Sequence, residues 1–304
     1  MEIWMNPEKT DPCILVLGMF DGVHMGHQSL IMTGMERAAE KKVPLYVCTF
    51  EPHPLHVLFP DRAPKLLTTL QERAGIMEGF GVDALCVHTF TREIAAQEPE
   101  AFLASVQERY SPREVICGYN FTFGRSGRGS GDMLRAWGSA HGVDVEIIPE
   151  VRIADEAVSS TRIRGELESG NIRMVNRLLG HAYMLSGKVL HGKGIGHTLG
   201  FATANIGVDP EKALPAFGVY LGVLRDGENQ WKCMVNIGRH PTLPEGGVTV
   251  EAHVLDAHPD LYDREVTLDI YGSVRPEIRF ENVDALVEQL KKDRAKAKAF
   301  FGMA

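Results

Sequence analysis

The sequence predicts two domains, an α/β domain built on a parallel sheet and a smaller antiparallel β-barrel that ends in a helix. Strand-like and helix-like segments alternate up to about residue 150, and from residue 183 strand-like segments follow one another without helices between them. The first pattern indicates βαβ units, and the second is typical of a small barrel. A length of 304 residues also favours two domains. We expect these to comprise residues 1–181 and 182–304.

In the first domain, apolar runs are expected to form the strands of the sheet. The run 13–18 shows no polar alternation and is therefore typical of a parallel strand buried on both faces. Helical patterns lie between the runs, including 28–42 and 69–80, the latter opened by the capping box at 69–72. The predicted strands are 13–18, 45–50, 83–89, 113–118 and 144–149.

A glycine-rich turn with two histidines follows the first predicted strand. Residues 18–27 read GMFDGVHMGH and lead directly into the predicted helix. The N–H groups and positive dipole end of a helix N-terminus bind anions, and glycines let a phosphate approach the backbone closely. Imidazoles there can donate hydrogen bonds to phosphate oxygens and carry a proton. His24 and His27 therefore indicate nucleotidyl transfer.

Two further strand ends carry informative segments, because ligands bind beyond the carboxyl ends of parallel strands. The sequence TFEPHP at 49–54 predicts an extended, rigid loop, or simply a turn. The segment 118–129 combines aromatic residues, glycines and two arginines. That composition suits a mobile loop that stacks on a flat ring and neutralises phosphate, with a plain solvated loop as the alternative.

A helix start at 159–164, sequence SSTRIR, is a second candidate anion site. Serine and threonine are N-cap residues for a helix through about Glu168, with Arg162 in its first turn. Arginine there opposes the helix dipole, so helix stability does not explain it. An anion held jointly by the helix N-terminus and Arg162 explains it, and a surface arginine is the alternative. A second helical pattern, 171–179, ends at Gly180.

The second domain is predicted to be a barrel with its own site. The dipeptide Asp226-Gly227 predicts a hairpin, and 283–300 predicts a closing helix. Thr203 and Asn205 place a hydroxyl and an amide oxygen on one side of an extended strand, and such hard ligands suit Mg²⁺ together with nucleotide phosphates. Glu277 follows the last strand and can act as a general base, with a surface glutamate as the alternative. The predicted strands are 184–190, 201–208, 218–225, 231–237, 248–255 and 265–274.

The composition excludes several classes of partner. The formal net charge is −8, whereas nucleic acids and anionic membranes require basic surfaces. The N-terminus shows no secretory signal pattern, and no apolar run approaches the ~18 residues of a membrane helix. The five cysteines contain no Cys-x-x-Cys pair, which argues against a disulfide framework and a zinc site. We therefore expect a soluble cytoplasmic protein, monomeric or weakly homo-oligomeric, with no nucleic-acid or membrane partner.

From about residue 13 to 293, these segments together resemble the prokaryotic bifunctional riboflavin kinase/FAD synthetase family. The resemblance implies a Rossmann-like HxGH nucleotidyltransferase domain that adenylylates FMN to FAD, followed by a barrel that phosphorylates riboflavin to FMN. Both reactions would use Mg²⁺ and ATP. The matching segments are FDGVHMGH at 20–27, TFEPHP at 49–54, NFTFG at 120–124, SSTRIR at 159–164, LGFATAN at 199–205, GVY at 218–220, NIG at 236–238, EAH at 251–253 with DLY at 260–262, and RPE at 275–277 before Phe280.

The resemblance also implies roles by position. His24 and His27 would bind the ATP phosphates and stabilise charge on the α-phosphate as FMN attacks it. Glu277 would accept the proton of the ribityl 5′-hydroxyl. The other implied contacts are Gly18, Phe20, Asp21 and Gly26 with ATP; Ser160, Thr161 and Arg162 with its β- and γ-phosphates; Asn120, Phe121 and Phe123 with the flavin, Asn120 also with its phosphate or Mg²⁺; Gly192, Gly194 and Gly200 with ATP in the barrel; and Thr203 and Asn205 with Mg²⁺.

Three residues depart from the family's usual pattern. Met19 replaces an asparagine, His197 an arginine and Ala202 a proline, and the last two lie beside the kinase motif. One alternative is therefore a monofunctional FMN adenylyltransferase whose barrel no longer phosphorylates flavin. A second is a non-catalytic flavin-binding regulator, and a third is an HxGH transferase for another substrate, such as phosphopantetheine or glycerol phosphate. The Thr-Ala-Asn barrel has no place in the third.

Overall fold

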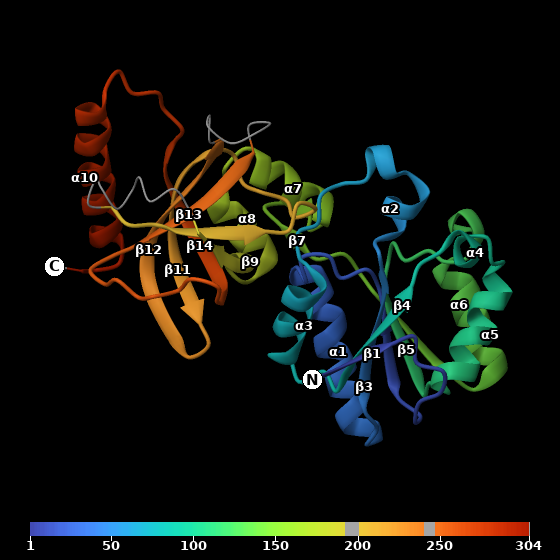
Figure 1. Ribbon diagram of the computed structural model, residues 1–304. Helices are drawn as coiled ribbons and strands as arrows, with labels where there is room; N and C mark the ends of the chain where they lie inside the picture. The colour runs from blue at the N-terminus through green and yellow to red at the C-terminus, as the bar shows by residue number, and fades with distance from the viewer. Residues whose placement is uncertain (192–200, 240–246, 304) are drawn as a thin grey trace. The chain divides into compact units, whose positions relative to one another are not determined.

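The computed structural model describes residues 1–191, 201–239 and 247–303, and the chain divides into two compact units, Met1–Ser160 and Thr161–Ala304 (Figure 1). The first contains a six-stranded sheet with helices, and the second a closed barrel with a C-terminal helix. The predicted fold class is thereby confirmed. The division lies earlier in the chain than the domain boundary expected after residue 181, and that boundary stays a prediction.

The sheet of the first unit is parallel throughout, with strand order β1-β4-β3-β2-β5-β6. All five apolar runs form strands. The additional edge strand β1 was not predicted because its apolar run, Ile3 to Met5, is only three residues long and mostly exposed. The strands are β1 Glu2–Met5, β2 Ile14–Leu17, β3 Leu45–Glu51, β4 Ala84–Thr89, β5 Glu114–Gly118 and β6 Asp144–Ile148.

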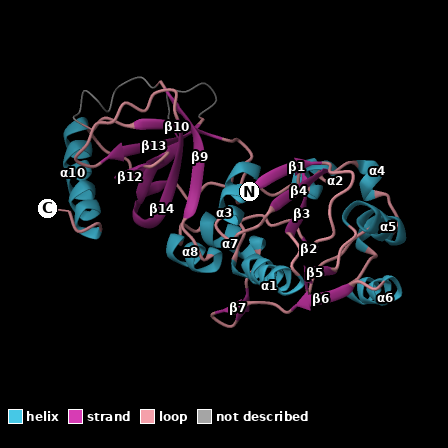
Figure 2. Cartoon of the chain, turned by 90° about the horizontal axis from the view of Figure 1, so that it is seen from below, coloured by secondary structure: helices cyan, strands magenta, loops and turns pink. Residues whose placement is uncertain are grey.

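Helices cover both faces of this sheet, α1 and α3 on one and α5 and α6 on the other (Figure 2). The central strand shows why its sequence does not alternate. Ile14 and Val16 belong to the core under α1 and α3, while Leu15 and Leu17 belong to the core under α5 and α6. The helices are α1 Met25–Lys41, α2 Pro54–Leu58, α3 Leu70–Glu78, α4 Arg92–Ala95, α5 Pro99–Tyr110 and α6 Gly131–His141, with short 3₁₀ turns at Pro60–Arg62 and Arg125–Gly127.

Two local predictions for this unit had different outcomes. The capping box is present, since Thr69 Oγ1 accepts from the Glu72 N–H and the Glu72 carboxylate accepts from the Thr69 N–H. The extended loop predicted at 49–54 is wrong beyond His53. Pro54 begins the short helix α2 there, because proline fits the first helical position and His53 Nδ1 caps the Leu55 N–H at 3.2 Å.

The barrel of the second unit closes in the order β10-β13-β12-β11-β14-β9, with antiparallel neighbours throughout. Closure removes the free strand edges that an open sheet would expose. The predicted hairpin is present, with Asp226 opposite Asn229. The elements are β9 Tyr183–Leu190, β10 Ala204–Val208, β11 Gly218–Asp226, β12 Asn229–Arg239, β13 Val248–Val254 and β14 Glu265–Pro276, with α7 Ser160–Glu168 and α8 Ile172–Leu179 before them and α10 Val283–Phe300 after them.

Two helices dock on the barrel through buried polar contacts. Asn176 of α8 donates to the Ile270 carbonyl and accepts from the Tyr183 N–H, both at 2.8 Å. In α10, the fully buried carboxylate of Asp293 accepts from Arg275 Nε at 2.8 Å. These contacts satisfy side chains that would otherwise be costly to bury.

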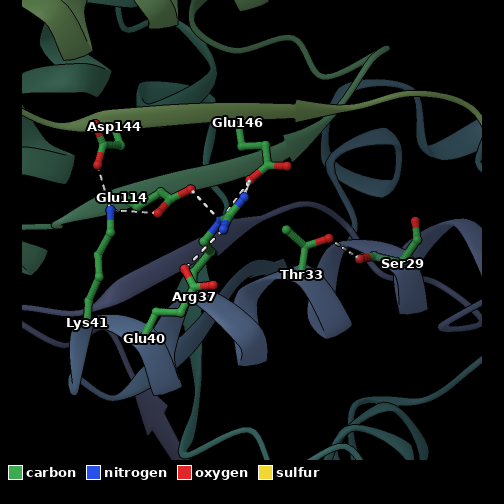
Figure 3. Close-up of polar contacts among 8 residues, drawn as sticks. All are labelled: Ser29, Thr33, Arg37, Glu40, Lys41, Glu114, Asp144 and Glu146. Atoms are coloured by element: carbon green, nitrogen blue, oxygen red, sulfur yellow. Dashed lines mark hydrogen bonds and ion pairs between the residues drawn. The ribbon is translucent and has the colours of Figure 1, made fainter.

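An ion-pair cluster joins the end of α1 to the first residues of β5 and β6 (Figure 3). The buried carboxylate of Glu114 lies 2.7 Å from Lys41 Nζ and 3.5 Å from Arg37 Nε. Lys41 also pairs with Asp144, and Arg37 with Glu40 and Glu146. The cluster lies at the amino ends of the strands, opposite the edge at which parallel sheets bind ligands. Its role is therefore structural.

Removing the buried carboxylate should destabilise the first unit. We expect Glu114→Ala to lower the free energy of unfolding by about 2 kcal/mol, because two cations lose their partner but remain partly solvated. Urea denaturation followed by tryptophan fluorescence measures the change. The control is Glu40→Ala, which removes an exposed carboxylate from the same cluster and should cost under about 0.5 kcal/mol. Equal effects of the two substitutions would contradict the structural role.

Candidate active sites

The turn between β2 and α1 has a strained backbone that several hydrogen bonds hold in place. Phe20 and Val23 have φ angles of 54° and 40°, a region that is unfavourable for a β-branched residue such as valine. The Val23 N–H donates to the Phe20 carbonyl at 3.0 Å, and Gln28 Nε2 donates to the Val23 carbonyl at 2.8 Å. The Gly22 N–H donates to Thr68 Oγ1 at 2.8 Å. Such strain persists only where the surroundings enforce it, and it is concentrated at functional sites.

The two histidines of this turn are stacked. His24 is the N-cap of α1, and its Nδ1 accepts from the His27 N–H at 3.3 Å. The rings lie 3.7 Å apart with an interplanar angle of 14°. A Cβ at Gly26 would come within 3.1 Å of His24 Cε1, so glycine leaves room for the ring. Because Nδ1 of His24 accepts, the proton of the neutral imidazole is on Nε2, where it can be donated to a phosphate oxygen.

Both imidazoles are neutral at pH 7. Burial lowers the pKa of His24 to about 4. Burial also holds the pKa of His27 well below its ordinary value, and the neighbouring His24 and Arg73 lower it further. Neutral rings of this kind can stabilise phosphate charge by donating hydrogen bonds, and that role of the pair stays a prediction.

Other residues predicted to contact ATP make buried contacts that hold the turn in place. The Asp21 carboxylate is buried and accepts from the Leu67 and Thr68 N–H groups at 2.9 and 3.0 Å. A Cβ at Gly18 would lie 3.0 Å from the Phe20 ring, which is itself fully buried. Ser160, the first residue of α7, donates from Oγ to the Asp21 carbonyl at 2.9 Å. Thr161 and Arg162 follow in the first turn of α7, as predicted for that helix.

The aromatic segment after β5 is partly packed into the core. Phe123 is only 5% exposed, and its ring lies 5.2 Å from that of Phe102 and 5.9 Å from that of Phe121. Its backbone bonds to Gly129 in both directions and closes the loop. Asn120 and Tyr119 are exposed, Tyr119 at 52%. Flavin contacts of Asn120, Phe121 and Phe123 stay predictions.

Sequence reasoning missed Arg73 of α3. Its side chain is fully buried, and Nη1 donates to Thr49 Oγ1 at 3.4 Å, beside the histidine turn. A signal was present, because Arg73 lies three residues after Leu70 and four before Met77, on the apolar side of the helix. A charged residue at such a position needs a partner or a function.

In the barrel, strand register assembles a polar row. Asn205 of β10 lies opposite Glu251 of β13, and Glu251 lies opposite Asn236 of β12. Residues opposite one another share a face of the sheet, so the three side chains point the same way. Their neighbours Ala252 and Val235 are fully buried inside the barrel. The polar row therefore lies on the outer face.

Glu277 reaches the same face from the end of β14. Its N–H donates to the Phe217 carbonyl at 3.1 Å, and a Cβ at Gly238 would lie 2.7 Å from its Oε1. Gly238 is two residues beyond Asn236 on β12, so the absence of a side chain there makes room for the carboxylate. Strand spacing puts the backbones of Asn205 and Asn236 about 10 Å apart. Asn205 and Glu277 thus flank one outer patch of the barrel.

Thr203, just before β10, and Asn205, inside it, have side-chain oxygens that fit a magnesium–nucleotide complex. Thr203 lines a cavity of about 180 Å³ with Ala204, His258 and Tyr262. Among the residues that the structure describes, no group of three or more His, Cys, Asp or Glu side chains could hold a metal. The side-chain oxygens of Thr203 and Asn205, together with nucleotide phosphates, would form a donor set that suits Mg²⁺. The predicted ATP contacts Gly192, Gly194 and Gly200, and the departure at His197, lie outside the described residues.

Comparison with known proteins bears on both units. A family model described as FAD synthetase matches residues 6–162, and one described as riboflavin kinase matches residues 179–301. A bifunctional riboflavin kinase/FMN adenylyltransferase of Listeria monocytogenes is 34% identical over 95% of this chain and 92% of its own. The chain belongs to this bifunctional family. The Escherichia coli protein of the same name is also 34% identical, over 98% of this chain and 96% of its own.

A solved structure shares the fold over nearly the whole length of this family member. It is named a macrolide-efflux protein from Streptococcus pneumoniae, is 27% identical and has a TM-score of 0.89, with 98% of this chain and 99% of that chain covered. Across the described part of the present chain, no helix is both long and apolar enough to cross a membrane.

The neutral state of His24 should make stability depend on pH. Its folded pKa of about 4 lies below the unfolded value near 6.5, so the unfolded chain binds more protons between these values. Stability contributed by the neutral ring is complete above the unfolded pKa and is lost as the pH falls toward the folded one. We expect His24→Asn, which keeps an N-cap, to reduce the slope of unfolding free energy against pH by on the order of 1 kcal/mol per unit. Urea denaturation between about pH 7 and pH 5 tests this, and an unchanged slope would contradict it.

Proposed function

We propose that this enzyme converts riboflavin to FMN in the barrel and FMN to FAD in the α/β unit, using Mg²⁺ and ATP in both steps. The single observation that carries the proposal is the joint presence of two groups of polar residues, the histidine turn and the row with Glu277, in units matched by the two family models. Its five cysteines are buried thiols, which fits a reducing cytoplasm. We propose a monomer or weak homo-oligomer with no nucleic-acid partner.

In the first reaction, Glu277 accepts the proton of the riboflavin 5′-hydroxyl as its oxygen attacks the γ-phosphate of ATP, and ADP leaves. Thr203 and Asn205 would hold the Mg²⁺ of the bound nucleotide through their side-chain oxygens. Bound Mg²⁺ supplies charge neutralisation on the phosphates. The outer patch of the barrel suits this chemistry because the base and the oxygen ligands approach it from different strands.

In the second reaction, a phosphate oxygen of FMN attacks the α-phosphate of ATP and pyrophosphate leaves. His24 and His27 donate hydrogen bonds to the phosphates from neutral rings, and the N-terminus of α1 adds its dipole. Ser160, Thr161 and Arg162 bind the leaving pyrophosphate in this proposal. Because the turn is held by many hydrogen bonds, these donors need little reorganisation.

The first alternative, an adenylyltransferase with an inactive barrel, rests on His197 and Ala202. The backbone at Ala202 is held by a specific hydrogen bond. His253 Nδ1 lies 2.9 Å from the Ala202 carbonyl and donates to it, since a carbonyl oxygen only accepts. This bond restrains the backbone just before Thr203. Alanine, unlike the proline usual at this position, does not fix its own φ angle. It favours an active kinase over an inactive one.

A paired turnover assay tests the proposed function. Purified protein receives Mg²⁺ and ATP with riboflavin in one tube and FMN in the other, and chromatography separates FMN from FAD. FAD in both tubes is expected. FAD from FMN alone would restrict the enzyme to the second reaction, and flavin binding with turnover in neither tube would favour a non-catalytic regulator.

Replacing His27 should separate the two activities. We expect His27→Ala to slow FAD formation from FMN at least ~100-fold, because a donor to the phosphates is lost. FMN formation from riboflavin should stay within about twofold, since the proposed kinase residues that the structure describes share no partner with His27. Steady-state rates of both reactions on one preparation measure this, and equal loss of both would contradict two separate sites.

Replacing Glu277 should have the opposite effect. Glu277→Gln removes the base while keeping the size of the side chain, and we expect FMN formation to fall about 100-fold or more. FAD formation from supplied FMN serves as the control and should be retained. An unchanged kinase rate would rule out Glu277 as the base.

A further inference from the structure

Arg73 is an unusual buried charge. Its side chain has no exposed surface, and its Nη2 lies 3.8 Å from Glu51 Oε2. Among the residues that the structure describes, neither Nε nor Nη2 has a hydrogen-bond partner, and the bond from Nη1 to Thr49 Oγ1 is long at 3.4 Å. Buried guanidinium groups normally make several short charge-assisted bonds. Packing alone therefore does not account for an arginine here.

The guanidinium lies next to the histidine turn. Thr49 Oγ1 receives its bond and itself donates to the Met19 carbonyl at 3.1 Å, so one hydroxyl connects Arg73 to the turn. The residues just before α3 are tied to the same turn, through the Asp21 carboxylate and the Gly22 N–H. His27 is near enough for the charge of Arg73 to act on it.

Carboxylates surround this side of the turn. The carboxylates that interact electrostatically with Arg73 are Asp21, Glu51 and Glu72. Negative charges within a few ångströms repel an incoming polyphosphate, and a partly buried setting strengthens the repulsion. A guanidinium remains protonated at physiological pH and therefore counters them permanently.

We propose that Arg73 is a positioning residue of the adenylyl-transfer site, whose buried positive charge counters the carboxylates beneath the ATP phosphates and holds Thr49 against the histidine turn. It acts without contacting substrate. This inference rests on the proposed FMN adenylylation.

The test compares Arg73→Met, which removes the charge, with Arg73→Lys, which keeps it, in the full chain. For FAD formation from FMN, we expect R73M to raise the KM for ATP at least tenfold with a smaller change in kcat. R73K should keep the KM within threefold. A KM for R73M within twofold of the original, or equal losses in R73M and R73K, would overturn the proposal.

A second substitution separates charge from folding. If carboxylate repulsion raises the KM for ATP, the double variant R73M/E51Q should have a KM at least threefold lower than that of R73M. A purely structural defect would not be relieved by E51Q. If R73M does not fold, the single variant E51Q and the variant R73K provide the test instead. E51Q is expected to lower the KM for ATP at least twofold, and an unchanged or raised KM would overturn the inference.

The original protein is assayed in parallel, so that two failures are distinguishable. Absence of FAD formation by the unaltered chain would refute the proposed function itself. Normal FAD formation with a KM for ATP that does not respond to the charge at position 73 would refute only the role of Arg73.

Discussion

The Asp21 residue links three segments of the first unit, and the candidate adenylyl-transfer site depends on these links. Its carboxylate accepts from the backbone just before α3, and its carbonyl accepts from Ser160 at the start of α7. The residue itself lies in the turn that carries both histidines. A buried carboxylate with several N–H donors is a strong and rigid connection, because leaving any of these groups unpaired would be costly. The strained turn can therefore keep its shape before substrate binds.

In the barrel, strand register holds the candidate site residues in place. No single residue holds Asn205, Glu251 and Asn236 in one row; the pairing of β10, β13 and β12 does. In a closed barrel this pairing cannot slip by one residue without turning the buried face outward. Gly238 then leaves space for the Glu277 carboxylate on the same face. Rigid strands thus position groups that belong to different segments of the chain.

Periodicity and turn chemistry predicted most of the fold. Apolar runs gave the strands from β2 onward in the first unit and the strands of the barrel, because burial on one or two faces leaves a local pattern. Strand β1 was missed because an exposed edge strand has no such pattern. Helix α2 was missed because two prolines favour an extended chain, whereas the second of them fits the first position of a helix.

The candidate site residues could be proposed from the sequence where they are neighbours along the chain. The histidine pair, the α7 start and the Thr-Ala-Asn segment are local motifs. The position of Phe123 in the core, the burial of Arg73 and the row across the barrel depend on packing between distant segments, which a single sequence does not display. Arg73 was nevertheless detectable as a charge on an apolar helix face.

The central claim is that one chain carries two independent sites that share FMN as product and substrate. The most direct measurement mixes the His27→Ala and Glu277→Gln proteins and follows FAD formation from riboflavin, Mg²⁺ and ATP. Two independent sites predict that neither variant alone makes appreciable FAD, whereas the mixture does so because FMN passes through solution from one protein to the other. A mixture no more active than its separate components, although each retains its own half-reaction, would contradict the account.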